Sequence, residues 1–153
     1  MEQIPIVTSG TVISSSVFGN VVGAAINRVG AYAKRTTTLS IAGGGSVVPI
    51  TFPTEVADAG GLFTAGGSVF TVPADKGGLY SCCLTVQSAV TGQLFVTVTG
   101  DAASTWTFPL ESDGSASIVV PLDDGDTVEF SARNTGTTDD ISLAHAHVYR
   151  VAL

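Results

Sequence analysis

From Thr36 onward, the sequence is a series of short β-type runs separated by turn residues. The runs are rich in β-branched and aromatic side chains, and the segments between them contain Gly, Asp and Asn. Turns such as Asp75-Lys76-Gly77-Gly78 and Ser112-Asp113-Gly114 each contain a residue suited to a positive φ angle. Because many short strands follow one another without an intervening helix, the pattern predicts an all-β protein, a β-sandwich or jelly roll.

The expected strands are Thr36–Ile41, Ser46–Phe52, Ser68–Val72, Leu79–Ser88, Leu94–Thr99, Thr105–Leu110, Ser115–Leu122, Thr127–Asn134 and Ile141–Val151, and the Gly-rich region from Ala42 to Gly67 is otherwise read as loops. Alternation with period two assigns three apolar rows to the core. These rows are Tyr80, Cys82, Leu84 and Val86; Ala116, Ile118, Val120 and Leu122; and Val128, Phe130 and Ala132.

The last expected strand has two different faces. One row contains Ile141, Leu143, His145, His147, Tyr149 and Val151, and the other contains Ser142, Ala144, Ala146 and Val148. A strand that is apolar on both faces is covered on both sides. We expect the second sheet on one side and a neighbouring subunit on the other.

The segment before Thr36 reads differently. Ser14-Ser15-Ser16 offers an N-cap, and Val17 to Val29 follows without proline, which predicts a short helix. Phe18, Val22, Ala25 and Val29 have the spacing of a heptad seam. The helix either packs on its own domain or joins a larger assembly. We therefore divide the chain into an attachment segment, residues 1–35, and a jelly-roll domain, residues 36–153.

Charge is scarce and unevenly placed. Charged residues make up 12% of the chain and the net charge is −7, against a typical charged fraction of about 25%. This net charge disfavours nucleic-acid binding, and a charge-poor surface favours burial in an oligomer. We expect no membrane span, because no run of about 18 apolar residues exists. Arg28, Lys34 and Arg35 outnumber Glu2 in residues 1–50, either by chance or because this segment docks on an acidic partner.

Cys82 and Cys83 are the only cysteines. Adjacent strand residues point to opposite faces and cannot easily bridge each other, so both are interpreted as small core-type residues. The opening Met1-Glu2-Gln3-Ile4-Pro5 has no basic region followed by an apolar one, so we expect no secretory signal and assembly in a reducing cytoplasm.

Three motifs occur in the order found in one known family. They are Phe70-Thr71-Val72-Pro73, then Gly78-Leu79-Tyr80, and finally the stretch from Leu122 to Phe130 with its Gly125-Asp126 pair. Together they resemble the complement globular-head and tumour-necrosis-factor-like jelly roll, over about Thr36 to Leu153. The chain is similar in particular to small virion proteins of tailed bacteriophages, described as minor tail, receptor-binding or head-decoration proteins.

The resemblance implies a homotrimer located in the virion, with its N-terminal segment attached to the particle. We expect Tyr80, His145, His147 and Tyr149 at the trimer interface, and Phe18, Val22, Ala25 and Val29 at the attachment. The leading hypothesis is a tail-tip protein that contacts a host-surface glycan. The alternatives are a capsid decoration protein at threefold sites and a free carbohydrate-binding module. The expected partners are further copies of the chain and other virion proteins.

Several residues are candidates for other chemistry. His145-Ala146-His147 is either a metal-binding pair multiplied by symmetry or two hydrogen-bonded histidines. Asp123, Asp124, Asp126 and Glu129 form either a calcium site or a polar turn. Trp106 either stacks on a sugar or belongs to the core. We expect no cofactor, and no enzyme, because the sequence has neither a Gly-x-Ser-x-Gly elbow nor a phosphate-binding loop.

Overall fold

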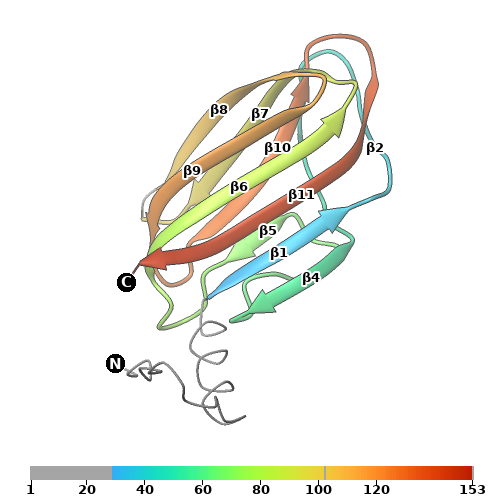
Figure 1. Cartoon of the computed structure of the whole chain (residues 1–153). Coiled ribbons are helices and arrows are strands. Elements are labelled where there is room, and N and C mark those ends of the chain that lie inside the picture. The colour runs from blue at the N-terminus through green and yellow to red at the C-terminus, as the bar shows by residue number, and fades with distance from the viewer. Residues whose placement is uncertain (1–28, 102, 153) are drawn as a thin grey trace, which may run out of the picture.

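The computed structural model describes residues 29–101 and 103–152, which form two antiparallel sheets packed face to face (Figure 1). Sheet A has the order β4-β1-β11-β6-β9, with β2 also paired to β11, and sheet B has the order β3-β10-β7-β8, with β5 also paired to β10. The strands are β1 Gly30–Arg35, β2 Leu39–Ile41, β3 Val47–Pro49, β4 Thr54–Ala59, β5 Val69–Thr71, β6 Gly78–Ser88, β7 Thr91–Thr99, β8 Ser104–Glu111, β9 Gly114–Leu122, β10 Thr127–Asn134 and β11 Asp139–Ala152. The predicted all-β jelly roll is confirmed.

The core lies between the two sheets and contains the three predicted apolar rows of β6, β9 and β10. At its centre, the rings of Phe52, Phe63, Phe70 and Phe130 pack edge-on or stacked, with ring centroids 4.6 to 6.4 Å apart. Tyr80 is also fully buried, and its hydroxyl donates to the Lys76 carbonyl at 2.6 Å. Phe70, Val72 and Tyr80 of the family motifs are therefore core residues.

Two strands were missing from the sequence prediction. β4 lies in the Gly-rich region that was read as loops, and β1 lies inside the segment that was assigned to attachment. β1 pairs with β11 on one side and with β4 on the other, so the jelly roll begins before the boundary predicted at Thr36. Val29 belongs to the sandwich as well, because its side chain is 5% exposed and its carbonyl accepts the Arg150 N–H.

Arg35 is a structural residue of the sandwich, although the charge count grouped it with a basic docking segment. Its guanidinium is buried and donates to the Thr51 carbonyl at 2.7 Å, the Thr37 carbonyl at 3.0 Å and the Thr51 hydroxyl at 2.5 Å. These bonds join the end of β1 to the loop before β4.

We expect the Arg35→Met variant to lose about 2 kcal/mol of unfolding free energy, because the oxygens around the guanidinium would be left without donors. Urea unfolding at one protein concentration measures the loss. The neighbouring Thr36 is exposed, so the Thr36→Ala variant should stay within about 0.5 kcal/mol of the parent. Equal losses in the two variants would contradict this role of Arg35.

The prediction for β11 needs one correction. Ile141 was placed in the same row as Leu143 and His145, but the pairing with β6 shifts between Ile141 and Leu143, which marks a bulge. The extra residue turns Ile141 into the core, where it is fully buried. The outward row therefore starts at Leu143 and continues through His145, His147 and Tyr149.

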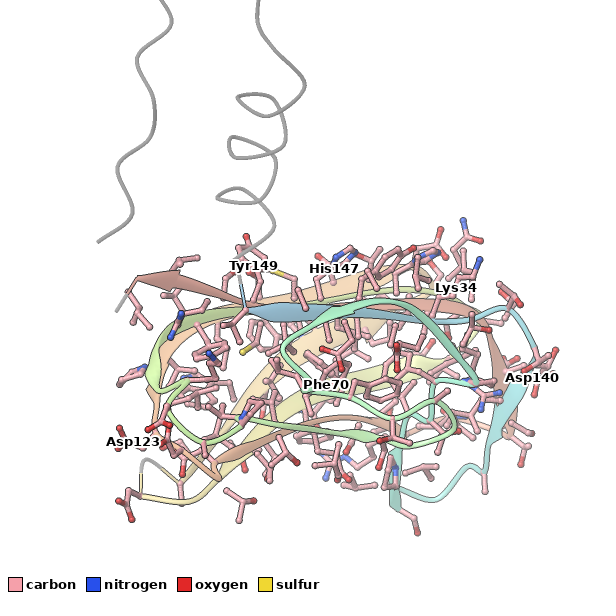
Figure 2. The ribbon with its side chains drawn as sticks, turned by 90° about the horizontal axis from the view of Figure 1, so that it is seen from below. Lys34, Phe70, Asp123, Asp140, His147 and Tyr149 are labelled. Carbon is pink, nitrogen blue, oxygen red and sulfur yellow. The ribbon has the colours of Figure 1, made fainter. Side chains whose placement is uncertain are left out.

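The loops gather at the two ends of the sandwich. The end where β1 begins and β11 finishes, the proximal end, carries the β5–β6, β7–β8 and β9–β10 turns. The opposite, distal end carries the β6–β7, β8–β9 and β10–β11 turns. Figure 2 shows Asp123 and Asp140 at these opposite ends. The described residues contain no helix that could span a bilayer.

The acidic β9–β10 turn is held by backbone donors at the proximal end. Asp124 accepts the N–H groups of Asp75, Lys76 and Gly77 at 2.7 to 3.0 Å, and these bonds lower the pKa of its carboxyl group. Asp126 accepts the N–H groups of Asp101 and Asp123. Asp124 and Asp126 thus stabilise a polar turn, in which Gly125 has a φ of 87°.

The lowered pKa of Asp124 has a consequence for stability. The ionised carboxylate stabilises the fold at any pH above its ordinary pKa of 3.8. This contribution disappears as the pH falls through the lower pKa that the group has in the folded state. We expect the Asp124→Ala variant to melt below the parent at pH 7, and the gap in Tm to shrink below about pH 4. Thermal unfolding at pH 7 and pH 3 tests this, and an unchanged gap would contradict it.

Candidate self-association face

The side of sheet A that faces away from the core is a broad strand surface, which we call the outer face. Strand alternation and register place on it Gly30, Tyr32 and Lys34 from β1; Thr54, Ala57 and Ala59 from β4; Leu79, Ser81, Cys83, Thr85 and Gln87 from β6; Ser115, Ser117, Val119 and Pro121 from β9; and Leu143, His145, His147 and Tyr149 from β11. Figure 2 shows Lys34, His147 and Tyr149 on this side, with Phe70 between the sheets.

The outer face carries almost no charge. Lys34 is the only Lys or Arg among these positions, and none of them is Asp or Glu in a chain that has 13 such residues. A carboxylate on this side of sheet A, Asp140, lies at the distal start of β11, opposite Ser40 of β2. An exposed face of a monomeric acidic protein would be expected to carry charges of both signs. The lack of carboxylates is therefore a property of these positions in particular.

An apolar patch lies at the proximal end of the outer face. Leu79, Val119 and Tyr149 are 36%, 60% and 39% exposed. The register makes them neighbours, since Ser81 lies opposite both Val119 and Tyr149, and Leu79 lies opposite Pro121. Large exposed apolar side chains that adjoin one another on a sheet are typical of a contact surface.

An aromatic cluster occupies the middle of the outer face. The ring of Tyr32 stacks on that of His147, with centroids 4.2 Å apart and planes 7° apart, and lies 5.7 Å from the ring of His145. The Tyr32 hydroxyl lies 2.5 Å from Nδ1 of His145. Burial, and secondarily His145, lower the pKa of His147. The two histidines thus form a packed group with Tyr32, in which His145 is within hydrogen-bonding distance and His147 is stacked.

The other residues predicted at the interface lie in different places. Tyr149 is on the outer face, but Tyr80 is fully buried inside the sandwich and is not available to a partner. The predicted attachment residues Phe18, Val22 and Ala25 lie outside the described residues. Val29, the fourth of that set, packs in the core of the sandwich instead.

The two cysteines have different surroundings. Cys82 is fully buried, and burial raises the pKa of its thiol to about 12, so it is an inert core residue as predicted. Cys83 points to the outer face, where its sulfur lies 3.2 Å from the Ser117 hydroxyl. Cys83 is therefore half-buried and not part of the core.

The remaining candidate residues do not come together in one site within the described part of the chain. Trp106 packs against the core from the edge strand β8, which agrees with the core interpretation. Over residues 29–101 and 103–152, no group of three or more His, Cys, Asp or Glu side chains is placed to hold a metal ion.

Solved structures share this fold. The globular domain of the zebrafish complement 1qA protein matches with a TM-score of 0.64 and 18% identity, over 80% of this chain and 97% of that one. The PRD1 vertex protein P5 matches with a TM-score of 0.59 and 20% identity, over 80% and 96%. Murine APRIL matches with a TM-score of 0.54 and 13% identity, over 80% and 99%. The fold is thus the jelly roll of complement globular heads and tumour-necrosis-factor-like proteins.

No protein-family model and no curated protein matches the sequence. The identities of the structural matches are low, so the shared property is the fold.

Sequence reasoning missed much of the outer face. Tyr32 and Lys34 were assigned to the attachment segment, and Leu79 and Val119 were not singled out. The alternation Gly30-Ala31-Tyr32-Ala33-Lys34, small residues between larger ones, is the signal that predicts a strand with one inward face of alanines.

Proposed function

We propose that the chain is a structural and adhesive protein of a tailed-phage virion, and that it acts as a homotrimer that packs through the outer face of sheet A. The observation that carries the proposal is the outer face itself, with 19 strand positions that include a single lysine and no carboxylate. Burial of such a surface costs little charge desolvation and gains about 25 cal/mol per Å² of apolar area before association costs. The role is binding and assembly, with no catalysis.

The fold supports an assembly of three copies of the chain. Proteins of the family that the motifs resemble assemble as trimers, and the matched solved structures share the jelly roll with this chain. A trimer around the outer face would cover the Leu79, Val119 and Tyr149 patch at the same time. The likeness to the PRD1 vertex protein P5 supports a place in a phage particle.

The position of Val29 supports an orientation of the jelly roll on the particle. Residues 1–28 precede Val29, which lies at the proximal end, next to Arg150 of β11. If this segment attaches to the particle, the distal end points away from it. The distal turns around Ala89, Asp113 and Gly136 would then be the parts that meet a host-surface glycan.

Deletion of residues 1–28 tests this division of labour. We expect the shortened chain to remain a folded trimer, because Val29 and all the described strands are kept, and to be absent from purified particles. Mass photometry measures the first property, and immunoblotting of virions measures the second. Incorporation of the shortened chain at the parent level would contradict attachment through this segment.

The tail tip is the proposed location, and capsid decoration is the second candidate, which the likeness to a vertex protein favours. The copy number per particle distinguishes them. A few trimers per virion indicate the tail, and hundreds of copies indicate the capsid. Binding of an isolated trimer to sugar without any copy in particles would instead indicate a free carbohydrate-binding module.

A further inference from the structure

Both histidines of this chain lie side by side on the outer face. The sequence contains two, His145 and His147, and both project outward from β11. Histidine is the side chain whose ordinary pKa places its charge change between pH 5 and 8. The side chains that change charge with mild acid are therefore concentrated on the surface through which the proposed trimer packs.

No carboxylate lies opposite either histidine in the strand register. In the register, β1 places Lys34 beside His145 and Tyr32 beside His147, and β6 places Thr85 and Cys83 on the other side. The next strands place uncharged side chains beyond these, Thr54 and Ala57 from β4 and Ser115 and Ser117 from β9. The carboxylates of these elements lie further off in the register, with Glu55 of β4 opposite Ala33 and Asp140 of β11 opposite Ser40 at the distal end. On β11 itself, Leu143 and Tyr149 flank the pair, and Arg150 donates to the carbonyls of Lys76 and Gly77.

The pair is packed against Tyr32 within the protomer. The Tyr32 hydroxyl occupies Nδ1 of His145, and Tyr32 covers one face of His147. Burial lowers the pKa of His147 within the single protomer. A second copy of the chain on the outer face would remove more water and bring further Lys34 and imidazole groups nearby, which disfavours protonation further.

We propose that His145 and His147 make self-association acid-sensitive, so that the trimer is stable at neutral pH and separates into folded protomers as the pH falls toward about 5. This inference rests on the proposed trimer. The direction follows from linkage: groups that are kept neutral on assembly favour the assembled form above their pKa and oppose it below. An imidazole of ordinary pKa, about 6.5, that stays neutral in the assembly weakens association roughly thirtyfold at pH 5. A trimer contains two from each chain.

Sedimentation of the full chain at pH 8, 7, 6 and 5 tests the inference, with far-UV circular dichroism to follow folding. We expect a species of about 46 kDa at pH 8, three chains of 15.4 kDa, and a folded 15.4 kDa species at pH 5. The His145→Gln/His147→Gln variant should remain a trimer at pH 5. The Glu129→Gln variant changes a titratable group of sheet B, away from the outer face, and should dissociate like the parent.

A second variant makes the test independent of the histidine replacements. The Lys34→Gln variant removes the fixed positive charge beside His145 and should need a lower pH to dissociate than the parent. Added salt screens repulsion between charges and should raise the trimer fraction at pH 5.

The outcomes separate the two proposals. A parent chain that is a trimer at both pH 8 and pH 5 would overturn the acid sensitivity and leave the trimer intact. Dissociation of the double histidine variant at the parent's pH, or unfolding of the parent in place of dissociation, would also overturn it. A monomer at pH 8 would overturn the proposed trimer itself.

Discussion

The Val119→Glu variant is expected to be a folded monomer under conditions in which the parent is a trimer. Val119 is 60% exposed in the protomer, so a glutamate at this position remains in water as long as the chain is alone. In the proposed assembly the same carboxylate is buried on a face that has no cation nearby except Lys34. An unpaired buried charge costs about 3–5 kcal/mol, and three copies bring three such charges.

Sedimentation at micromolar concentration measures the effect, which should be a roughly 100-fold or greater increase in the concentration needed for assembly. Val47 provides the matched control, because it is 52% exposed and lies on the outward side of β3 in sheet B. The Val47→Glu variant should assemble like the parent. If Val47→Glu dissociates and Val119→Glu does not, the wrong sheet has been assigned to the interface.

The Phe130→Ala variant is expected to lose about 3–5 kcal/mol of unfolding free energy. Phe130 is fully buried on β10 and packs edge-on against Phe52 and Phe70, with ring centroids 6.4 and 5.8 Å away. Its removal leaves a cavity that the surrounding sheets cannot close, because both are fixed by their ladders. For a domain with a total stability of about 5–15 kcal/mol, this loss is a large share of the unfolding free energy.

Urea unfolding of the variant measures this loss. The control is Phe95→Ala on β7, because Phe95 points away from the core and its ring lies 5.6 Å from the Arg133 guanidinium carbon. Loss of that contact should cost about 1 kcal/mol or less. Similar losses for the two phenylalanines would contradict the assignment of Phe130 to the centre of the core.

The features that the sequence predicted well are those with a strong local pattern. The rows that begin at Tyr80, Ala116 and Val128 place an apolar residue at every second position, and all three are buried as expected. The Gly125 turn was also recognisable, because a positive φ favours a residue without a Cβ.

The features that the sequence did not predict depend on tertiary contacts. β4 is mostly exposed and contains alanine, aspartate and glutamate, so its strand conformation comes from pairing with β1. The bulge after Ile141 reverses the face of one residue, and nothing in the local alternation marks it. Buried Arg35 looked like a surface charge because its partners, Thr37 and Thr51, lie in two separate loops.

The outer face was predicted only in part, because it too depends on tertiary contacts. The outward row of β11 was found from its alternation, but the neighbours that make it a face lie on β1 and β9, far away in the sequence. The scarcity of charge on this face became apparent only after the register had placed these strands side by side.

The most direct test of the account is the mass of the full chain in solution at pH 8 and micromolar concentration. The account predicts a stable species of about 46 kDa, three chains of 15.4 kDa. A stable species of 15.4 kDa at this concentration would contradict it, because the charge-poor outer face of sheet A would then be exposed to water and have no partner.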